Sequence, residues 1–169
     1  HHGRVLNYFH RMLWQDRERA QDFLQELFTK IARRPEQYDA SRPFVTWLFS
    51  VANNMCKNEY RRMQVRRKAA PQLAYEAETS TTPQAGRSVD HAHFRSRLEQ
   101  ELDRLDPDQK ATFVMRYHED LPIKEIAASF GCSEGTVKSR LFYTLKKLAE
   151  RLKEFGPEYL NTHERSIRP

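Results

Sequence analysis

The amino-acid sequence predicts an all-α protein made of two small helical domains joined by a flexible linker. Apolar residues recur at steps of three and four along most of the chain, and no segment shows the strict alternation of a strand. Residues 71–93 lack this helical period and are rich in Ser, Thr, Gln and Pro, a composition typical of a linker. We therefore expect helical domains at residues 1–70 and 94–155, and a polar tail at 156–169.

Composition and charge narrow the possible partners. The chain has 169 residues, of which 38% are hydrophobic and 31% charged. No run approaches the roughly 18 apolar residues of a membrane span, so we expect no membrane insertion. Lys and Arg total 29 against 23 Asp and Glu. Much of the excess lies in two blocks: residues 53–68 hold six basic and one acidic side chain, and residues 134–153 hold six and two. Such blocks are compatible with a polyanionic partner.

The two cysteines are informative about the cellular compartment of the protein but do not indicate a catalytic or metal-binding role. Cys56 and Cys132 have no C-x-x-C partner, so we expect reduced thiols and a cytoplasmic protein. The first residues do not show the pattern of a secretory signal peptide, which is a charged segment followed by an apolar segment and then small residues. The chain begins inside a predicted helix, and we expect further residues before His1.

The first domain is predicted to contain three helices. Residues 5–13 and 17–33 each place apolar side chains on one face, and a proline ends the second helix. Residues 36–43 form a loop with a tyrosine, an Asp-x-Ser sequence and a second proline. A third helix begins at Phe44, and its core face loses its apolar residues after Met55.

The opposite face of this third helix has a composition suited to nucleic acid. It carries amides, a tyrosine and basic side chains, namely Asn53, Asn54, Lys57, Tyr60, Arg61 and Gln64. Amides and aromatic rings can hydrogen-bond to and stack on bases while arginines bind phosphates. The alternative is that this end of the helix is simply solvated, because a run of charged residues on a helix usually binds no other molecule.

The second domain is predicted to begin with a helix at residues 94–105, whose leucines form a stripe. Asp106 and Pro107 then suit the N-cap and the first position of a further helix that reaches about residue 118. His91 and His93 precede this domain without other ligands nearby, so we expect no metal site there.

Residues 122–152 have the spacing of a helix-turn-helix. Ala127 suits the closest approach of the two helices, Gly131 suits a left-handed turn, and Val137 suits the small core between them. Ser133 is placed to cap the second helix, because its hydroxyl can accept from an amide of the first turn.

The second helix of this motif separates its residues by face. The apolar stripe contains Val137, Leu141, Leu145, Leu148 and Leu152, and the outer face contains Gly135, Thr136, Ser139, Tyr143 and Lys146. A small, polar and cationic face fits the major groove of DNA. An ordinary helical hairpin with solvated lysines is the alternative, but the alanine, glycine and valine spacing together with the polar face favours DNA.

Four segments in this order resemble one family. They are AQDFLQELF at residues 20–28, RPFVTWLFSVANNMCKNEYRR at 42–62, LDPDQKATFVMRY at 105–117 and GCSEGTVKSRL at 131–141. Together they resemble bacterial RNA polymerase sigma factors of the extracytoplasmic-function group, which contain only sigma regions two and four. The last segment is shared with other helix-turn-helix regulators, whereas the first two are more specific.

The resemblance implies three groups of functional residues. Docking on RNA polymerase would involve Asp22, Gln25, Glu26 and Thr29. Recognition of a melted minus-ten element would involve Tyr38, Asp39, Ser41, Asn53, Asn54, Lys57, Asn58 and Arg61. Recognition of a duplex minus-thirty-five element would involve Ser133, Thr136, Lys138, Ser139, Arg140, Tyr143 and Lys147. The partners that it implies are core RNA polymerase, promoter DNA and an anti-sigma factor.

The function that these observations predict is that of a promoter-specificity subunit. The sequence has no phosphate-binding loop, no pair of carboxylates in an apolar setting and no nucleophile with an evident base, so we expect no enzyme activity, cofactor or metal. One alternative is a stand-alone helix-turn-helix regulator that binds duplex DNA as a dimer, which leaves the asparagine-rich helix unexplained. Another is an interaction module or enzyme whose basic helices are merely solvated, which predicts that binding depends little on salt concentration.

Overall fold

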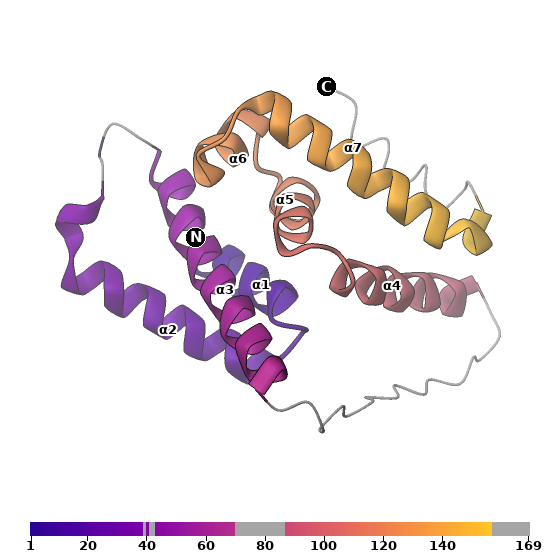
Figure 1. The fold of residues 1–169 in the computed structure, drawn as a ribbon, viewed down its shortest axis with the longest axis horizontal. Helices are drawn as coiled ribbons and strands as arrows, with labels where there is room; N and C mark the ends of the chain where they lie inside the picture. The colour runs from indigo at the N-terminus through magenta and orange to yellow at the C-terminus, as the bar shows by residue number, and fades with distance from the viewer. Residues whose placement is uncertain (39, 41–42, 70–86, 157–169) are drawn as a thin grey trace.

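The computed structural model describes residues 1–38, 40, 43–69 and 87–156, and this part of the chain is helical without any strand (Figure 1). Its α-helices are α1 (His2–Met12), α2 (Arg17–Arg33), α3 (Phe44–Ala69), α4 (Arg87–Asp103), α5 (Pro107–Tyr117), α6 (Ile123–Phe130) and α7 (Glu134–Arg151). Two short 3-10 turns, η1 (Pro35–Gln37) and η2 (Lys153–Phe155), follow α2 and α7. The prediction of an all-α fold with two helical domains is confirmed. Most of the predicted linker and the tail after Gly156 lie outside the described residues.

The first domain is built on α1, which packs against both α2 and α3. Aromatic side chains of α1 dominate this core, with Tyr8 edge-on to Phe49 at 5.4 Å and Phe9 edge-on to Phe23 at 5.5 Å between ring centroids. Such edge-to-face pairs add to the stabilisation that apolar burial provides. The three- and four-residue periodicity identified Phe9 and Phe23 as core residues but did not identify Tyr8 or Phe49.

A tight turn joins α1 to α2. Trp14 and Gln15 adopt left-handed backbone conformations, with φ of 56° and 60°, which are uncommon outside glycine. The ring of Trp14 packs edge-on against Tyr60 of α3 at 4.9 Å, and the Tyr60 hydroxyl donates to the carbonyl of Met12. The Asp16 carboxylate then caps α2 by accepting from the amide of Arg19 at 3.0 Å. Helix α3 therefore holds the turn that starts α2.

The second domain packs α5 and α6 against the long helix α7, with α4 against the C-terminal part of α7. Helix α4 begins at Arg87, so the prediction that the linker extends to residue 93 is wrong for its last seven residues. Two ring contacts support these early turns, because Phe155 lies 5.2 Å from His93 and 5.3 Å from Phe94. The sequence between residues 87 and 93 has no apolar stripe, and this long-range contact replaces one.

The two domains pack directly on each other. Helix α1 contacts α5, and α3 contacts both α5 and α6 (Figure 1). A single apolar core runs from Val5 in α1 through Phe49 in α3 and Met115 in α5 to Leu141 in α7. At its edge the buried ammonium of Lys110 lies 2.7 Å from Asp103 and 3.5 Å from the carbonyl of Met12. Among the described helices, none is long and apolar enough to cross a membrane.

Candidate nucleic-acid interface

The helix-turn-helix has the local geometry that the sequence predicts. Gly131 takes a left-handed conformation with φ of 63° and ends α6. Ala127, at the closest approach of the helices, and Val137, in the small core, are both buried. The hydroxyl of Ser133 accepts from the amide of Thr136 at 3.1 Å and so caps α7. The N-terminal turn of α7 is thereby fixed and open to solvent.

The outer face of α7 is polar at its start and aromatic further along. The predicted readers Thr136, Lys138, Ser139, Tyr143 and Lys147 are all exposed. Phe142 is also exposed, at 62%, and lies edge-on to Tyr143 at 5.4 Å. The sequence analysis did not select Phe142, although its place one residue after buried Leu141 was a signal for an outward-facing side chain. Phe142 and Tyr143 thus add two exposed rings to this face of α7.

Arg140 differs from its neighbours on α7. Its guanidinium carbon lies 5.1 Å from the ring centroid of Phe130, and its Nη2 atom lies 3.4 Å from Oδ2 of Asp108. The side chain is 24% exposed, and its Nη1 atom is buried without a hydrogen-bond partner among the described residues. In this conformation Arg140 therefore faces the protein rather than the solvent.

The polar face of α3 is only partly exposed. Asn54, Asn58 and Arg61 are solvent-exposed as expected. Asn53 is 2% exposed, and its Oδ1 accepts from the Tyr8 hydroxyl at 3.2 Å. The prediction of an exposed side chain at Asn53 is therefore wrong for this conformation, because α1 packs against that part of α3 and Tyr8 holds the amide. Lys57 is 31% exposed, and its Nζ atom lies 2.9 Å from Oδ1 of Asp108.

An aromatic group lies beside the loop between α2 and α3. The ring of Tyr38 packs edge-on to Phe44 at 5.5 Å and lies 5.2 Å from Trp47. Asp39 and Ser41, the other two loop residues expected at the minus-ten element, lie outside the described residues. The described part of the loop thus contributes a ring that is half-buried and already supported by two others.

The predicted polymerase-docking residues share one side of α2. Asp22, Glu26 and Thr29 follow one another at steps of four and three, with Gln25 beside them, and all four are exposed. The opposite side of α2 is buried through Leu24 and Leu27. Glu26 makes a surface ion pair with Lys30 at 2.6 Å, which contributes little to stability. This face is therefore not needed for the core of the domain.

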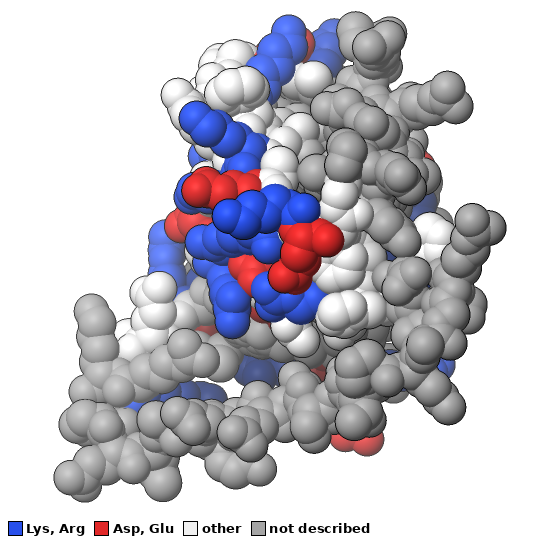
Figure 2. Space-filling model, turned by 90° about the vertical axis from the view of Figure 1, so that its right-hand side faces the viewer, with Lys and Arg blue, Asp and Glu red and all other residues white. Residues whose placement is uncertain are grey.

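The other end of α7 has a different charge pattern. Figure 2 views the molecule from the side where α4 begins and α7 ends, and there it shows basic and acidic side chains interleaved. Glu101, buried in α4, pairs with Arg97 at 3.3 Å, Arg104 at 2.7 Å and Arg151 at 3.2 Å. Arg97 also pairs with Glu154 at 3.4 Å. These cations are neutralised within the protein, so this end of α7 is a poor candidate for a phosphate-binding surface.

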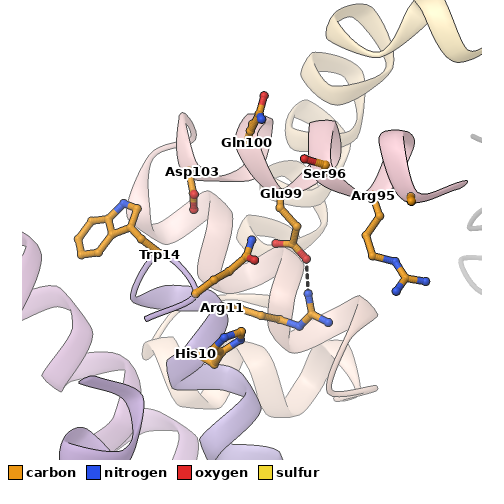
Figure 3. Close-up of a pocket in the computed structure, with 10 residues that line it drawn as sticks. His10, Arg11, Trp14, Arg95, Ser96, Glu99, Gln100 and Asp103 are labelled. Carbon is orange, nitrogen blue, oxygen red and sulfur yellow. Dashed lines mark hydrogen bonds and ion pairs between the residues drawn. The ribbon is translucent and has the colours of Figure 1, made fainter. Parts of the chain in front are cut away.

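A groove of about 640 Å³ lies between the end of α1 and α4. Figure 3 shows Trp14 on one side and Glu99, Gln100 and Asp103 of α4 on the other, with an ion pair between Arg11 and Glu99. The part of the chain that the structure describes holds no group of three or more His, Cys, Asp or Glu able to bind a metal ion. Two carboxylates that line the groove, Glu99 and Asp103, are paired with Arg11 and Lys110.

Burial raises the pKa of two groups that line the core, Glu119 after α5 and Cys56 on the buried side of α3. Burial raises the pKa of Glu119 from 4.5 to about 7, although the nearby Arg4 guanidinium acts to lower it. Burial also raises the pKa of the Cys56 thiol, which makes this cysteine unreactive at neutral pH. Desolvation by burial is the largest cause of both shifts.

Comparison with known proteins agrees with this architecture. Residues 1–67 match the family model for sigma-70 region 2, and residues 95–148 match the model for sigma-70 region 4. The chain is 32% identical over 158 residues to the ECF RNA polymerase sigma factor SigL of Mycobacterium tuberculosis, a match that covers 92% of this chain and 86% of SigL. It is 30% identical over 151 residues to the RNA polymerase sigma-H factor of Pseudomonas aeruginosa, covering 82% and 78% of the two chains.

A solved structure has a similar fold. The sigma factor RpoE of Bartonella quintana, determined in complex with the anti-sigma factor NepR, aligns with a TM-score of 0.64 at 20% sequence identity. The alignment covers 88% of this chain and 89% of RpoE.

The two helical domains and their matches define a sigma factor that contains regions 2 and 4. The chain belongs to the ECF RNA polymerase sigma factors. It is a sigma subunit for transcription initiation, a function exerted through binding to core RNA polymerase and promoter DNA. The resemblance seen in the sequence is confirmed, and membership of this family does not favour a stand-alone dimeric regulator.

Proposed function

We propose that the two domains divide promoter recognition between α7 and α3. The observation that carries this proposal is the outer face of α7, which is capped at Ser133, fully open to solvent at Thr136 and Ser139, and flanked by exposed lysines. The N-terminal part of such a helix enters the major groove, where side chains contact base edges. This domain would read the minus-thirty-five element as duplex DNA.

The readers on α7 fall into two kinds. Thr136, Ser139 and Tyr143 can contact base edges by hydrogen bonding, and Arg140 can bind guanine through two parallel hydrogen bonds. Lys138 and Lys147 suit phosphates, which fix the register of the helix without reading sequence. Ser133 acts through its cap, because its hydroxyl already accepts from the backbone of α7.

The first domain would bind the melted minus-ten element. Extrusion of a base costs a few kcal/mol, and stacking and edge contacts in a pocket offset that cost. Tyr38 supplies a ring supported by Phe44 and Trp47, and Asp39 and Ser41 lie beside it in the chain. Asn54, Asn58 and Arg61 of α3 add exposed amides and a cation, and Lys57 joins them once the second domain moves away. Asn53, which is buried against Tyr8 of α1, would contribute only if α1 also shifts.

The exposed side of α2 would dock on RNA polymerase through Asp22, Gln25, Glu26 and Thr29. This face is dispensable for the core of the domain, so its acidic and polar composition is free to serve a partner. An anti-sigma factor is a further expected partner, since the related RpoE structure contains one. Acting on RNA polymerase places the protein in the cytoplasm, and catalysis would belong to the polymerase alone.

Transcription in vitro with core RNA polymerase and a promoter library tests the proposal. Arg140→Ala should lower discrimination at one position of the upstream element by about 1 to 3 kcal/mol. Lys147→Ala is the matched control, because loss of a phosphate contact should weaken all promoters alike. If Arg140→Ala kept the library preference of the unmodified factor, as Lys147→Ala should, Arg140 would not be a reader of the upstream element.

The docking surface needs a separate assay. Asp22→Ala combined with Gln25→Ala should reduce capture of core RNA polymerase while leaving the helical content unchanged. The matched control is Arg17→Ala with Gln21→Ala, which alters two exposed positions of the same helix that are four residues apart and lie outside the proposed side. Equal capture by both double variants would show that this side of α2 is not the docking surface.

A further inference from the structure

Asp108, in the first turn of α5, pairs with cations from both domains. Its Oδ1 atom lies 2.9 Å from Nζ of Lys57 on α3, and its Oδ2 atom lies 3.4 Å from Nη2 of Arg140 on α7. One carboxylate therefore holds a residue expected at the minus-ten element and a residue expected at the minus-thirty-five element. The two assignments come from the function proposed above, on which this inference rests.

The ring of Phe130, the last residue of α6, binds the same two cations. Lys57 Nζ lies 5.3 Å from its centroid and the Arg140 guanidinium carbon lies 5.1 Å from it. Both distances are within the range of cation–π attraction. A carboxylate and an aromatic face thus take the places that a phosphate and a base would take in a nucleic-acid complex.

Further contacts close the same interface. Ser129 of α6 donates to the carbonyl of Thr46 in α3 at 3.0 Å, and this bond is buried. On the other side of the interface, Arg4 and Arg11 of α1 pair with Glu119 and Glu99 of the second domain. The second domain therefore covers part of α3 through several contacts. Among them, the ion pairs of Asp108 also keep two proposed DNA-binding side chains, Lys57 and Arg140, from binding DNA.

The closed arrangement is incompatible with simultaneous contact to both promoter elements. Elements centred about 25 base pairs apart lie about 85 Å apart along B-form DNA, at about 3.4 Å per base pair. The 17 residues from 70 to 86 that separate the two described parts can extend over at most about 60 Å. Only separated domains with an extended connection span that distance. The domains must therefore part when both elements are bound.

We propose that Asp108 is an intramolecular latch that holds Lys57 and Arg140 in the free protein and competes with nucleic-acid phosphate for both. Opening the latch frees α3 and α7 together, so exposure of the two readers is coupled. The Nη1 atom of Arg140 has no hydrogen-bond partner among the described residues. Because a buried donor without an acceptor is costly, this contact is one that a better ligand can replace. Binding to DNA then supplies the missing acceptors.

The test removes the latch and measures the domains directly. Asp108→Asn keeps the size of the side chain and removes its charge, and Asp108→Lys repels both partners. Glu154→Gln is the matched control, because it changes the net charge equally on the same domain but away from the interface. Circular dichroism establishes that each variant retains its helices.

Spin labels at Gln21→Cys on α2 and Glu150→Cys on α7, both exposed positions, report the distance between domains in the full chain. Cys132→Ser in every sample leaves buried Cys56 as the remaining native thiol. We expect the Asp108 variants, but not Glu154→Gln, to shift the distance distribution to longer values. Unchanged distributions in both Asp108 variants would overturn the latch and would leave the proposed promoter contacts untouched.

The second measurement is DNA binding by the free factor, without polymerase. The probe is a fluorescein-labelled duplex of mixed sequence with a single-stranded tail. Loss of two partly exposed ion pairs should tighten binding of Asp108→Asn by about threefold to thirtyfold relative to Glu154→Gln. Longer distances without tighter binding would overturn the competition with phosphate, and would also count against the DNA roles of Lys57 and Arg140.

Discussion

Glu119 should make the stability of the protein depend on pH around neutrality. This carboxylate follows α5 at the boundary between the domains, and its side chain is 3% exposed. Burial raises its pKa to about 7, whereas Arg4 and Arg11 on α1 lower it and Asp120 raises it further. The folded protein therefore binds a proton at Glu119 more tightly than the unfolded chain does. The stabilisation is fully present below the unfolded pKa of 4.5 and is lost as pH rises through about 7.

The magnitude follows from the two pKa values. Between pH 8.0 and pH 5.5 a folded carboxyl with a pKa near 7 becomes almost fully protonated, whereas the unfolded carboxyl stays mostly ionised. The difference in proton binding corresponds to about 2 kcal/mol if the whole shift acts. One side of the carboxylate faces Arg4, whose side chain is 40% exposed, so water screens part of the interaction. We therefore expect about 1 kcal/mol of added stability at pH 5.5.

Urea unfolding followed by circular dichroism, at constant ionic strength between pH 5.5 and pH 8.0, measures this effect. Glu119→Gln is the comparison, because an amide occupies the same site and does not titrate. All histidines are present in both proteins, so their titration cancels in the difference between the two curves. The free energy of unfolding of the unmodified protein should fall relative to Glu119→Gln as pH rises. Parallel curves would show that Glu119 keeps an ordinary pKa in the folded state.

Three further predictions concern local structure. Ser133→Ala removes the cap of α7 and should lower the free energy of unfolding by about 1 kcal/mol, whereas Ser133→Asp should retain it; urea titration compares the two. Gly131→Ala would meet no steric clash, but the φ of 63° at this position is strained for any residue with a side chain. The melting temperature should therefore fall by an amount equivalent to about 1 kcal/mol. A gain in stability would contradict the left-handed turn. Cys132 alone should react with a thiol reagent in the native protein, and Cys56 should react only after denaturation, as a count of labelled thiols by mass spectrometry will show.

The features that the sequence determined are those set by neighbours in the chain. The bounds of α2 agree with the prediction because Asp16 caps one end and a proline follows the other. Asp106 caps α5, and Gly131 ends α6 in the left-handed conformation, both as expected. Each of these depends on interactions over four residues or fewer, which the sequence displays directly.

The core was predicted less completely, because its members are chosen by long-range packing. Tyr8 has a polar end and did not count as apolar, yet it is buried through its contact with Phe49 and its hydrogen bond to Asn53. Lys110 is a charged residue on α5 that is buried against Asp103 and the backbone of α1. Composition gives no sign of either, since burial of a polar group depends on a partner that is distant in sequence.

The sequence alone determined that this protein has two helical domains, a capped recognition helix and a polar face on each domain, because helical periodicity and capping are local. Only the tertiary structure decided which parts of those faces are accessible. Asn53, Lys57 and Arg140 have residue types suited to nucleic acid, but α1 buries the first through Tyr8. The packing of the second domain on α3 pairs the other two with Asp108. The physical reason is that residues distant in the chain supply the acceptor for each cation, and only the fold brings that acceptor within reach.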